Sequence, residues 1–346
     1  MRPQMAARPL HLFEAGVVTE TRFAGMAAAP GALSEHFVRR LGPEKHVRVP
    51  FNPRDRWVSA AREACRTLGE AIGSSMRSGA TCAVLGGECT VVAGSLAGAL
   101  PLEPDLALVY FDAHGDFNTL ATTPSHYVGG MCLAHVCGRS VAPLLWPGSH
   151  KIAEDHVALV GGRALDAGER TNLDRSKVTR IRFDAEQADT AGVIAFARKR
   201  KIWLHVDIDI VDPAEVGAVV FPAPGGVSLA LLGETIASLA TVSDVRGFEL
   251  CGYDARQDPG GKLPSAIASP SVERLTPLGA GNTTAENSLG STTSRSTCSQ
   301  IFFLRANATT APVSARSAPN GMRVTRERSR FVRSPGSSAR PPTRAT

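Results

Sequence analysis

Short apolar runs rich in β-branched residues alternate along the chain with longer segments whose apolar residues recur every three or four positions. This alternation is typical of βαβ units and of a mostly parallel sheet. Several runs are apolar at consecutive positions, as strands covered on both faces are. The pattern predicts an α/β fold with eight strands, at 8–14, 47–50, 81–87, 105–113, 156–162, 178–183, 201–210 and 245–250, and helices at 55–78, 91–100, 185–199 and 229–240.

The character of the sequence changes near Lys262. The segment after it is rich in Ser, Thr, Arg and Pro and holds one apolar island, IFFL at 301–304. We therefore expect one folded domain over 1–261 and a solvated, largely disordered tail over 262–346. Two alternatives for the tail stay open, a basic RNA-binding arm and a shifted reading frame. The tail lacks the interleaved aromatic residues that stack bases, which disfavours the first.

Composition and charge exclude several classes of protein. With 43% hydrophobic and 20% charged residues, the chain is neither a disordered protein nor a disulfide scaffold. The net charge of +6 comes from the end of the chain, where nine arginines and one acid follow position 304, so the rest holds 29 basic and 31 acidic residues. This balance predicts no nucleic-acid partner for the main body.

The same sequence predicts a protein without a membrane span. No apolar run approaches the ~18–20 residues that a span needs, and the start lacks the apolar core of a secretory signal. The seven cysteines lack CxxC spacing and fit reduced thiols. We expect a cytoplasmic protein.

Acidic residues gather where two predicted strands end, the place where ligands bind to open parallel sheets. The two clusters are Asp112, His114 and Asp116 after the fourth strand, and Asp207, Asp209 and Asp212 after the seventh. At alternate positions of an extended chain, side chains project to one side. Five converging carboxylates repel one another unless cations are bound. Oxygen ligands with one nitrogen suit Mn²⁺ or a similar metal.

The motifs DAHGD at 112–116 and DIDIVDP at 207–213 resemble those of the ureohydrolase superfamily, which includes arginase, agmatinase and formimidoylglutamase. Weaker similarities are LGGECT at 85–90, DFNT at 116–119, GGRALDAGE at 161–169 and FELCGYD at 248–254. The resemblance implies a three-layer α/β/α arginase-like fold on an eight-stranded, mostly parallel sheet. It also implies two Mn²⁺ ions per chain, a small guanidino or amidino substrate whose C–N bond is hydrolysed to release urea or a related amide, and a trimer or hexamer.

The resemblance also assigns roles to individual residues. The implied metal ligands are Cys89, Asp112, His114, Asp116, Asp207 and Asp209. Of these, Asp112 and Asp207 would bridge both ions, and Asp209 would accept a proton from water. Glu249 would pair with the substrate guanidinium. The positions implied for the distal polar groups of the substrate are Asn118 and Ser125. Asp166 and Glu169 match acids near the substrate amino group.

The sequence departs from the family pattern at several of these places. Cys89 stands where the family has a histidine ligand, so it is either a softer ligand that favours Zn²⁺ or Fe²⁺, or an inert thiol. Gly129 stands where arginases carry a proton-shuttling histidine, Tyr127 where they use an amide, and Phe221 where they use a small hydroxyl residue. The substrate therefore stays open among arginine, agmatine, guanidinobutyrate and formiminoglutamate. The alternative function is that of a non-catalytic relative that binds or regulates.

Overall fold

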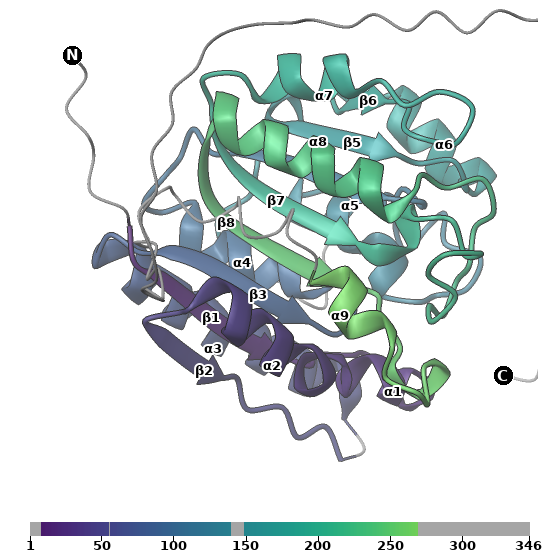
Figure 1. Cartoon of the computed structure of the whole chain (residues 1–346). Helices are drawn as coiled ribbons and strands as arrows, with labels where there is room; N and C mark the ends of the chain where they lie inside the picture. Colours follow the sequence, from purple (N-terminus) through teal and green to yellow (C-terminus); the bar gives the residue numbers. More distant parts are fainter. Residues whose placement is uncertain (1–7, 55, 140–148, 269–346) are drawn as a thin grey trace, which may run out of the picture. The chain divides into compact units, whose positions relative to one another are not determined.

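Eight parallel strands form the sheet at the centre of the fold (Figure 1). They pair in the order β2-β1-β3-β8-β7-β4-β5-β6, and every pairing is parallel. Their bounds are β1 Leu10–Ala15, β2 Lys45–Arg48, β3 Thr81–Gly86, β4 Ala107–Asp112, β5 Val157–Gly161, β6 Thr179–Ile181, β7 Lys201–Asp207 and β8 Asp244–Cys251. The computed structural model describes residues 8–54, 56–139 and 149–268. The predicted eight-stranded α/β fold is confirmed.

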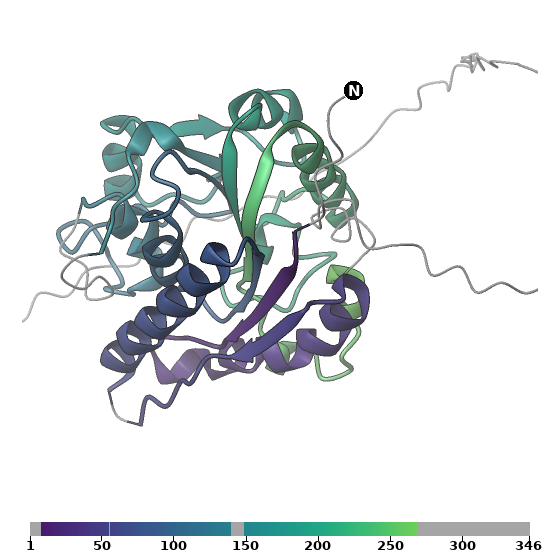
Figure 2. The same cartoon turned by 90° about the vertical axis from the view of Figure 1, so that its left-hand side faces the viewer.

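Helices cover both faces of the sheet. The helices are α1 Ala24–Ala27, α2 Ala29–Leu41, α3 Trp57–Arg77, α4 Val91–Ala99, α5 Cys132–Val136, α6 Ala167–Asp174, α7 Thr190–Ala197, α8 Leu229–Val242 and α9 Leu263–Ile267. Helices α2, α7, α8 and α9 share one apolar core with the sheet, and α3, α4 and α5 share a second core with its other face. Figure 2 shows α2 and α3 on opposite sides of the strands. The architecture is therefore three layers, α/β/α.

The four predicted helices correspond to α3, α4, α7 and α8, whereas α2 was not predicted. Leu33, Phe37 and Leu41 of α2 recur every four positions and are all buried. This spacing places them on one face of a helix, so the signal was present in the sequence. Gly42, with a φ of +53°, ends α2 in the left-handed conformation that glycine adopts readily.

The carboxyl ends of five neighbouring strands, β3, β8, β7, β4 and β5, meet at one edge of the sheet. Strands β4 and β7 pair as far as Phe111 and Val206, so Asp112 and Asp207 follow side by side. The extended chain stops there. Asp116 has a φ of +49°, and residues Ile208–Ile210 form a 3₁₀ turn. Turns rather than continued strand alternation therefore bring the later residues of both motifs to the pocket.

The folded region continues past Gly261, the predicted end of the domain. Helix α9 follows, and Ile267 and Ala268 are buried in the core that α2 shares with the sheet. Residues 269–346, nearly all of the predicted tail, lie outside the described residues, so its disorder stays a prediction. Within the described ranges, none of the helices combines the length and the apolar character needed to cross a bilayer.

Candidate metal centre

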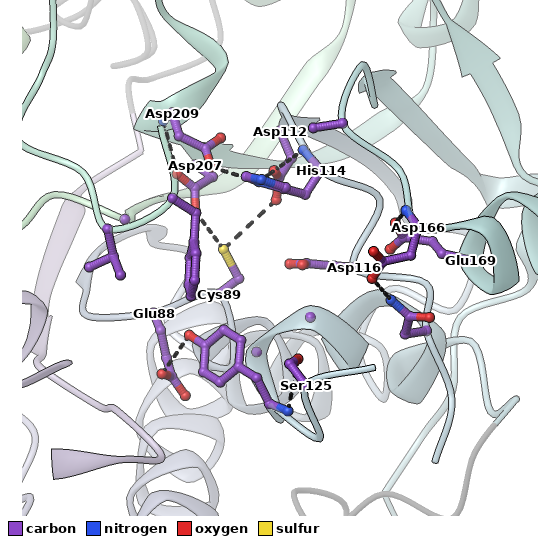
Figure 3. Close-up of a pocket in the computed structure, with 18 of the residues that line it drawn as sticks. Glu88, Cys89, Asp112, His114, Asp116, Ser125, Asp166, Glu169, Asp207 and Asp209 are labelled. Carbon is purple, nitrogen blue, oxygen red and sulfur yellow. Dashed lines mark hydrogen bonds and ion pairs between the residues drawn. The ribbon is translucent and has the colours of Figure 1, made fainter. Parts of the chain in front are cut away.

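A cavity of about 530 Å³ opens at the carboxyl ends of the strands. It is lined by ten of the eleven residues that the sequence singled out as site residues: Cys89, Asp112, His114, Asp116, Asn118, Ser125, Asp166, Glu169, Asp207 and Asp209. Figure 3 shows all of these side chains except that of Asn118 labelled around one space. Residues up to 120 positions apart in the sequence are thus brought together by the parallel sheet.

The first group of potential metal ligands is Asp112, His114 and Asp209, which offer three ligand atoms within 4.8 Å of one another. The His114 Nδ1 atom lies 2.9 Å from Asp209 Oδ2 and 3.5 Å from Asp112 Oδ1. Burial opposes protonation of His114, but hydrogen bonds to the two carboxylates outweigh it and raise the pKa of His114 to about 12. Backbone N–H groups fix the carboxylates: Ala113 donates to Asp209, and His114 donates to Asp112.

The second group is Cys89, Asp112 and His205, whose ligand atoms also lie within 4.8 Å of one another. All three residues are buried. Asp112 belongs to both groups, a position that suits a bridging ligand. His205 was not predicted as a site residue, because it lies inside the apolar run of the seventh strand and carries no motif.

The Cys89 thiol points into the cluster of carboxylates, as Figure 3 shows. Its Sγ atom lies 2.9 Å from Asp207 Oδ2 and 4.0 Å from Asp112 Oδ2. Burial, together with the neighbouring Cys132, Cys251 and the carboxylates, raises the pKa of the Cys89 thiol well above its usual value. The geometry of Cys89 is that of a residue facing the site.

The carboxylates of this site are crowded. Burial and the charge of Asp209 raise the pKa of Asp207 to about 6, and burial and Asp112 raise the pKa of Asp209. Burial, with Cys132 and Asp112 nearby, also raises the pKa of Asp116, whose Oδ2 atom accepts a hydrogen bond of 2.6 Å from the Tyr110 hydroxyl. Buried acids that resist ionisation in this way are stabilised as anions by bound cations. The donor set therefore fits divalent metal ions.

Asp212 does not join the other acids. Its carboxylate accepts hydrogen bonds from the backbone N–H groups of Ala214, Gly225 and Gly226, and Asp212 does not line the cavity. The expectation that five carboxylates converge is therefore wrong for Asp212, and the other four line the cavity. The reason is the 3₁₀ turn after Asp207, which redirects the chain before Asp212.

Four predicted substrate residues line the other side of the cavity. Asn118 Nδ2 donates to Asp166 Oδ2 at 2.9 Å, and Asp166 and Glu169 form a capping box at the start of α6. Glu169 also accepts the Phe117 N–H at 2.8 Å, and burial raises its pKa to about 7. Ser125 is exposed at the rim. The carboxylates of Asp166 and Glu169 thus hold together the segments that form this wall of the cavity.

The structure does not bring Glu249 into the cavity. Strand β8 runs on to Cys251, so Glu249 lies two residues before its end, and the side chain is fully buried beneath the pocket. There its carboxylate accepts a hydrogen bond from the Ser95 hydroxyl and contacts His205 Nδ1 at 2.7 Å. Gly252, three positions later, lines the cavity instead.

Glu88 and Tyr127 are pocket residues that were not predicted as site residues. The Tyr127 hydroxyl donates to Glu88 Oε2 at 2.7 Å, and burial raises the pKa of Glu88 to about 7. The Tyr127 ring packs against Phe23 and Phe221, at centroid distances of 4.7 and 5.5 Å. Tyr127 and Phe221 therefore line the cavity with aromatic rings, and the buried Phe23 ring packs against both. The position of Glu88 beside Cys89 in LGGECT was the available signal.

Known proteins resemble this chain in sequence. The arginase from Bacillus caldovelox is 31% identical over 199 residues, which cover 54% of this chain and 66% of that protein. The N(omega)-hydroxy-L-arginine amidinohydrolase from Streptomyces lavendulae is 31% identical over 169 residues, which cover 47% of this chain and 59% of that protein. The match thus spans less than two thirds of the length of either relative.

Solved structures show the same fold. The crystal structure of the Bacillus caldovelox arginase superimposes with a TM-score of 0.69 at 25% identity, covering 78% of this chain and 98% of that one. Formimidoylglutamase from Bacillus subtilis gives a TM-score of 0.63 at 14% identity, covering 79% and 87%. The model of the arginase family matches residues 21–275, most of the chain and all of the cavity. This chain therefore belongs to the arginase family.

Proposed function

We propose that this chain is a metal-dependent hydrolase of linear amidines, which cleaves a guanidino C–N bond and releases urea or a related amide. The observation that carries the proposal is the place of Asp112, which the two groups of potential ligands share at the base of the cavity. A cavity of about 530 Å³ suits a small guanidino compound. The names of two relatives, an arginase and a hydroxyarginine amidinohydrolase, support the same chemistry.

The proposed ligands of two Mn²⁺ ions are Cys89, Asp112, His114, Asp116, Asp207 and Asp209. Carboxylate and imidazole donors suit Mn²⁺, whereas a cysteine ligand favours Zn²⁺ or Fe²⁺. When bound, two such cations lower the pKa of water enough for hydroxide to be available near neutral pH.

The chain's own residues would orient the substrate and take up the proton. Asp209 is the proposed proton acceptor, because its buried carboxylate faces the cavity beside His114. Glu88 is the proposed partner of the guanidinium, because its carboxylate lines the cavity next to Cys89. Asn118, Ser125, Asp166 and Glu169 are proposed to hold the distal polar groups of the substrate.

A non-catalytic binding or regulatory protein is the second candidate function. Two observations favour it: Glu249, the predicted partner of the guanidinium, lies outside the cavity, and the cavity-lining positions 129 and 252 are glycines. Such a protein would keep the fold and bind a guanidino compound without hydrolysing it.

A substrate panel separates the two candidates. The full chain would be loaded with Mn²⁺, Fe²⁺ or Zn²⁺ in turn and offered L-arginine, its hydroxylated form, agmatine, guanidinobutyrate and formiminoglutamate. Metal-dependent release of urea or the corresponding amide, lost in Asp112→Asn, is the expected result. Calorimetric binding without release would favour the second candidate, and neither binding nor release would contradict both.

We further propose a cytoplasmic location, which the six free cysteines among the described residues support, since thiols stay reduced there. Assembly into a trimer or hexamer is proposed from the family resemblance. Light scattering of the purified chain tests it, and a monomer would contradict it.

A further inference from the structure

His205 lies in the sheet directly beneath the metal centre. It is on β7 and pairs in register with Tyr110 of β4 and Glu249 of β8. Its side chain is completely buried, and its ring stacks on the Tyr110 ring with a centroid distance of 3.9 Å and an interplanar angle of 3°. The imidazole therefore has one fixed orientation.

The two ring nitrogens of His205 have different surroundings. Nδ1 lies 2.7 Å from Glu249 Oε1, whereas Nε2 is buried without a hydrogen-bond partner among the described residues. Leaving a buried polar atom unpaired is unfavourable, so a partner for Nε2 is expected. When Nδ1 donates its hydrogen bond to the Glu249 carboxylate, it carries the proton of the neutral ring, and Nε2 keeps a free lone pair. The Nε2 atom can therefore accept a hydrogen bond or bind a metal ion, and it has neither partner among the described residues.

A metal ion would supply the missing partner of Nε2. One ligand atom each from Cys89, Asp112 and His205 lie within 4.8 Å of one another, and Glu249 already occupies Nδ1, so Nε2 is the free atom. To bind one metal ion, these three atoms would have to move together by only about 1 Å, since metal–nitrogen and metal–sulfur distances are about 2.0–2.3 Å. Thiolate, imidazole and carboxylate together form a donor set for Zn²⁺, Fe²⁺ or Co²⁺.

We propose that His205 Nε2 is a metal ligand, and that Glu249 is the positioning residue that holds its ring. The inference rests on the proposed function in so far as that function requires a metal centre. Metal-bound histidines usually donate their second ring N–H to a carboxylate, which fixes the tautomer and the ring orientation. The hydroxyl of Ser95 donates to the other oxygen of Glu249 and fixes the carboxylate in turn.

With His205 as a metal ligand, the roles of Cys89 and Glu249 differ from those expected from the sequence. In the second group of potential ligands, His205 of β7 supplies the imidazole that position 89 lacks. Glu249 then has a role without contacting substrate, in agreement with its complete burial beneath the cavity.

His135 provides a matched control. It is also completely buried, and neither of its ring nitrogens has a hydrogen-bond partner among the described residues. It belongs to neither group of potential ligands and does not line the cavity. Burial alone therefore does not make a histidine of this chain a candidate ligand.

The test uses the full chain, stripped with a chelator and reloaded with Co²⁺. X-ray absorption counts its ligands, and we expect two imidazoles, from His114 and His205, and one sulfur, which Cys89→Ser removes. In His205→Gln the amide still hydrogen-bonds to Glu249, but one imidazole is lost and the affinity for one ion falls at least about 10-fold. His135→Phe should bind Co²⁺ as the unmodified chain does.

A single imidazole in the unmodified chain, or failure to bind Co²⁺ at all, would overturn the assignment even if His205→Gln does not fold. Unchanged affinity and spectrum in a folded His205→Gln would overturn it as well. Both readouts are taken without substrate. If two imidazoles are found and no guanidino compound is hydrolysed, the ligand assignment stands and the proposed function fails.

Discussion

Tyr127 occupies the space that a side chain at position 129 would need. A Cβ atom added to Gly129 would lie 2.4 Å from both the hydroxyl oxygen and the Cζ atom of Tyr127. The two departures from the family pattern, at 127 and at 129, are therefore one structural change. The Tyr127 hydroxyl is held by Glu88, so the ring cannot move aside without losing that hydrogen bond.

This relationship predicts that Gly129→His alone destabilises the protein, by about 1–3 kcal/mol, as overpacking of a filled site does. The double variant Tyr127→Asn, Gly129→His should recover most of the lost stability, because the smaller amide clears the space. Chemical denaturation of the single and double variants measures the difference. Equal stability of Gly129→His and the unmodified chain would show that the two side chains do not compete.

We expect that position 252, like position 129, does not tolerate a side chain. Its φ of +82° is strained for other residues, and an added Cβ would lie 2.1 Å from Asp207 Oδ1. We predict that Gly252→Ala displaces the Asp207 carboxylate and lowers the amount of bound metal. The matched control is Gly225→Ala, at a φ of +83° with open space around it. A Gly252→Ala protein that binds metal as the control does would refute the clash.

Cys89→His restores the ligand type of the family. We expect it to raise Mn²⁺ occupancy, since imidazole is a better ligand than a thiolate for this metal. Elemental analysis after Mn²⁺ loading and desalting gives the occupancy. An unchanged value would mean that position 89 does not coordinate the ion, and the thiol would then be a buried bystander.

His135 predicts a pH dependence of stability. Burial lowers its pKa from 6.5 to about 4, so the folded state keeps the ring neutral where the unfolded chain is protonated. The contribution of the neutral His135 ring to the free energy of unfolding is fully present above pH 6.5. It is lost as the pH falls towards 4, by up to about 3 kcal/mol. His135→Phe should therefore lose less stability than the unmodified chain between pH 7 and pH 4. If denaturation shows that both proteins lose the same free energy of unfolding between pH 7 and pH 4, His135 is not the source of the pH dependence.

The strands and most of the site were predictable from the sequence, because both depend on local patterns. Consecutive apolar residues mark strands buried on two faces, and the first acid of each paired motif is the last residue of β4 or of β7. The parallel register then brings Asp112 and Asp207 together without further information.

The remaining features depend on small offsets along the chain. Glu249 was expected to contact substrate because FELCGYD resembles a motif of the family, yet β8 extends to Cys251 and carries the carboxylate below the cavity. His205 resembles any polar residue in a buried strand until the pairing with Glu249 is known. The contact of Tyr127 with position 129 is a matter of side-chain volume in three dimensions, which sequence spacing does not report.

Metal stoichiometry per chain tests the central claim most directly. The unmodified protein and Asp112→Asn would be incubated with Mn²⁺, Fe²⁺ or Zn²⁺ in turn, desalted and analysed for bound metal. Because Asp112 is shared by both groups of ligands, we predict two ions in the unmodified chain and loss of both in the variant. One ion or none in the unmodified chain, or two ions retained by Asp112→Asn, would contradict a metal centre bridged by Asp112.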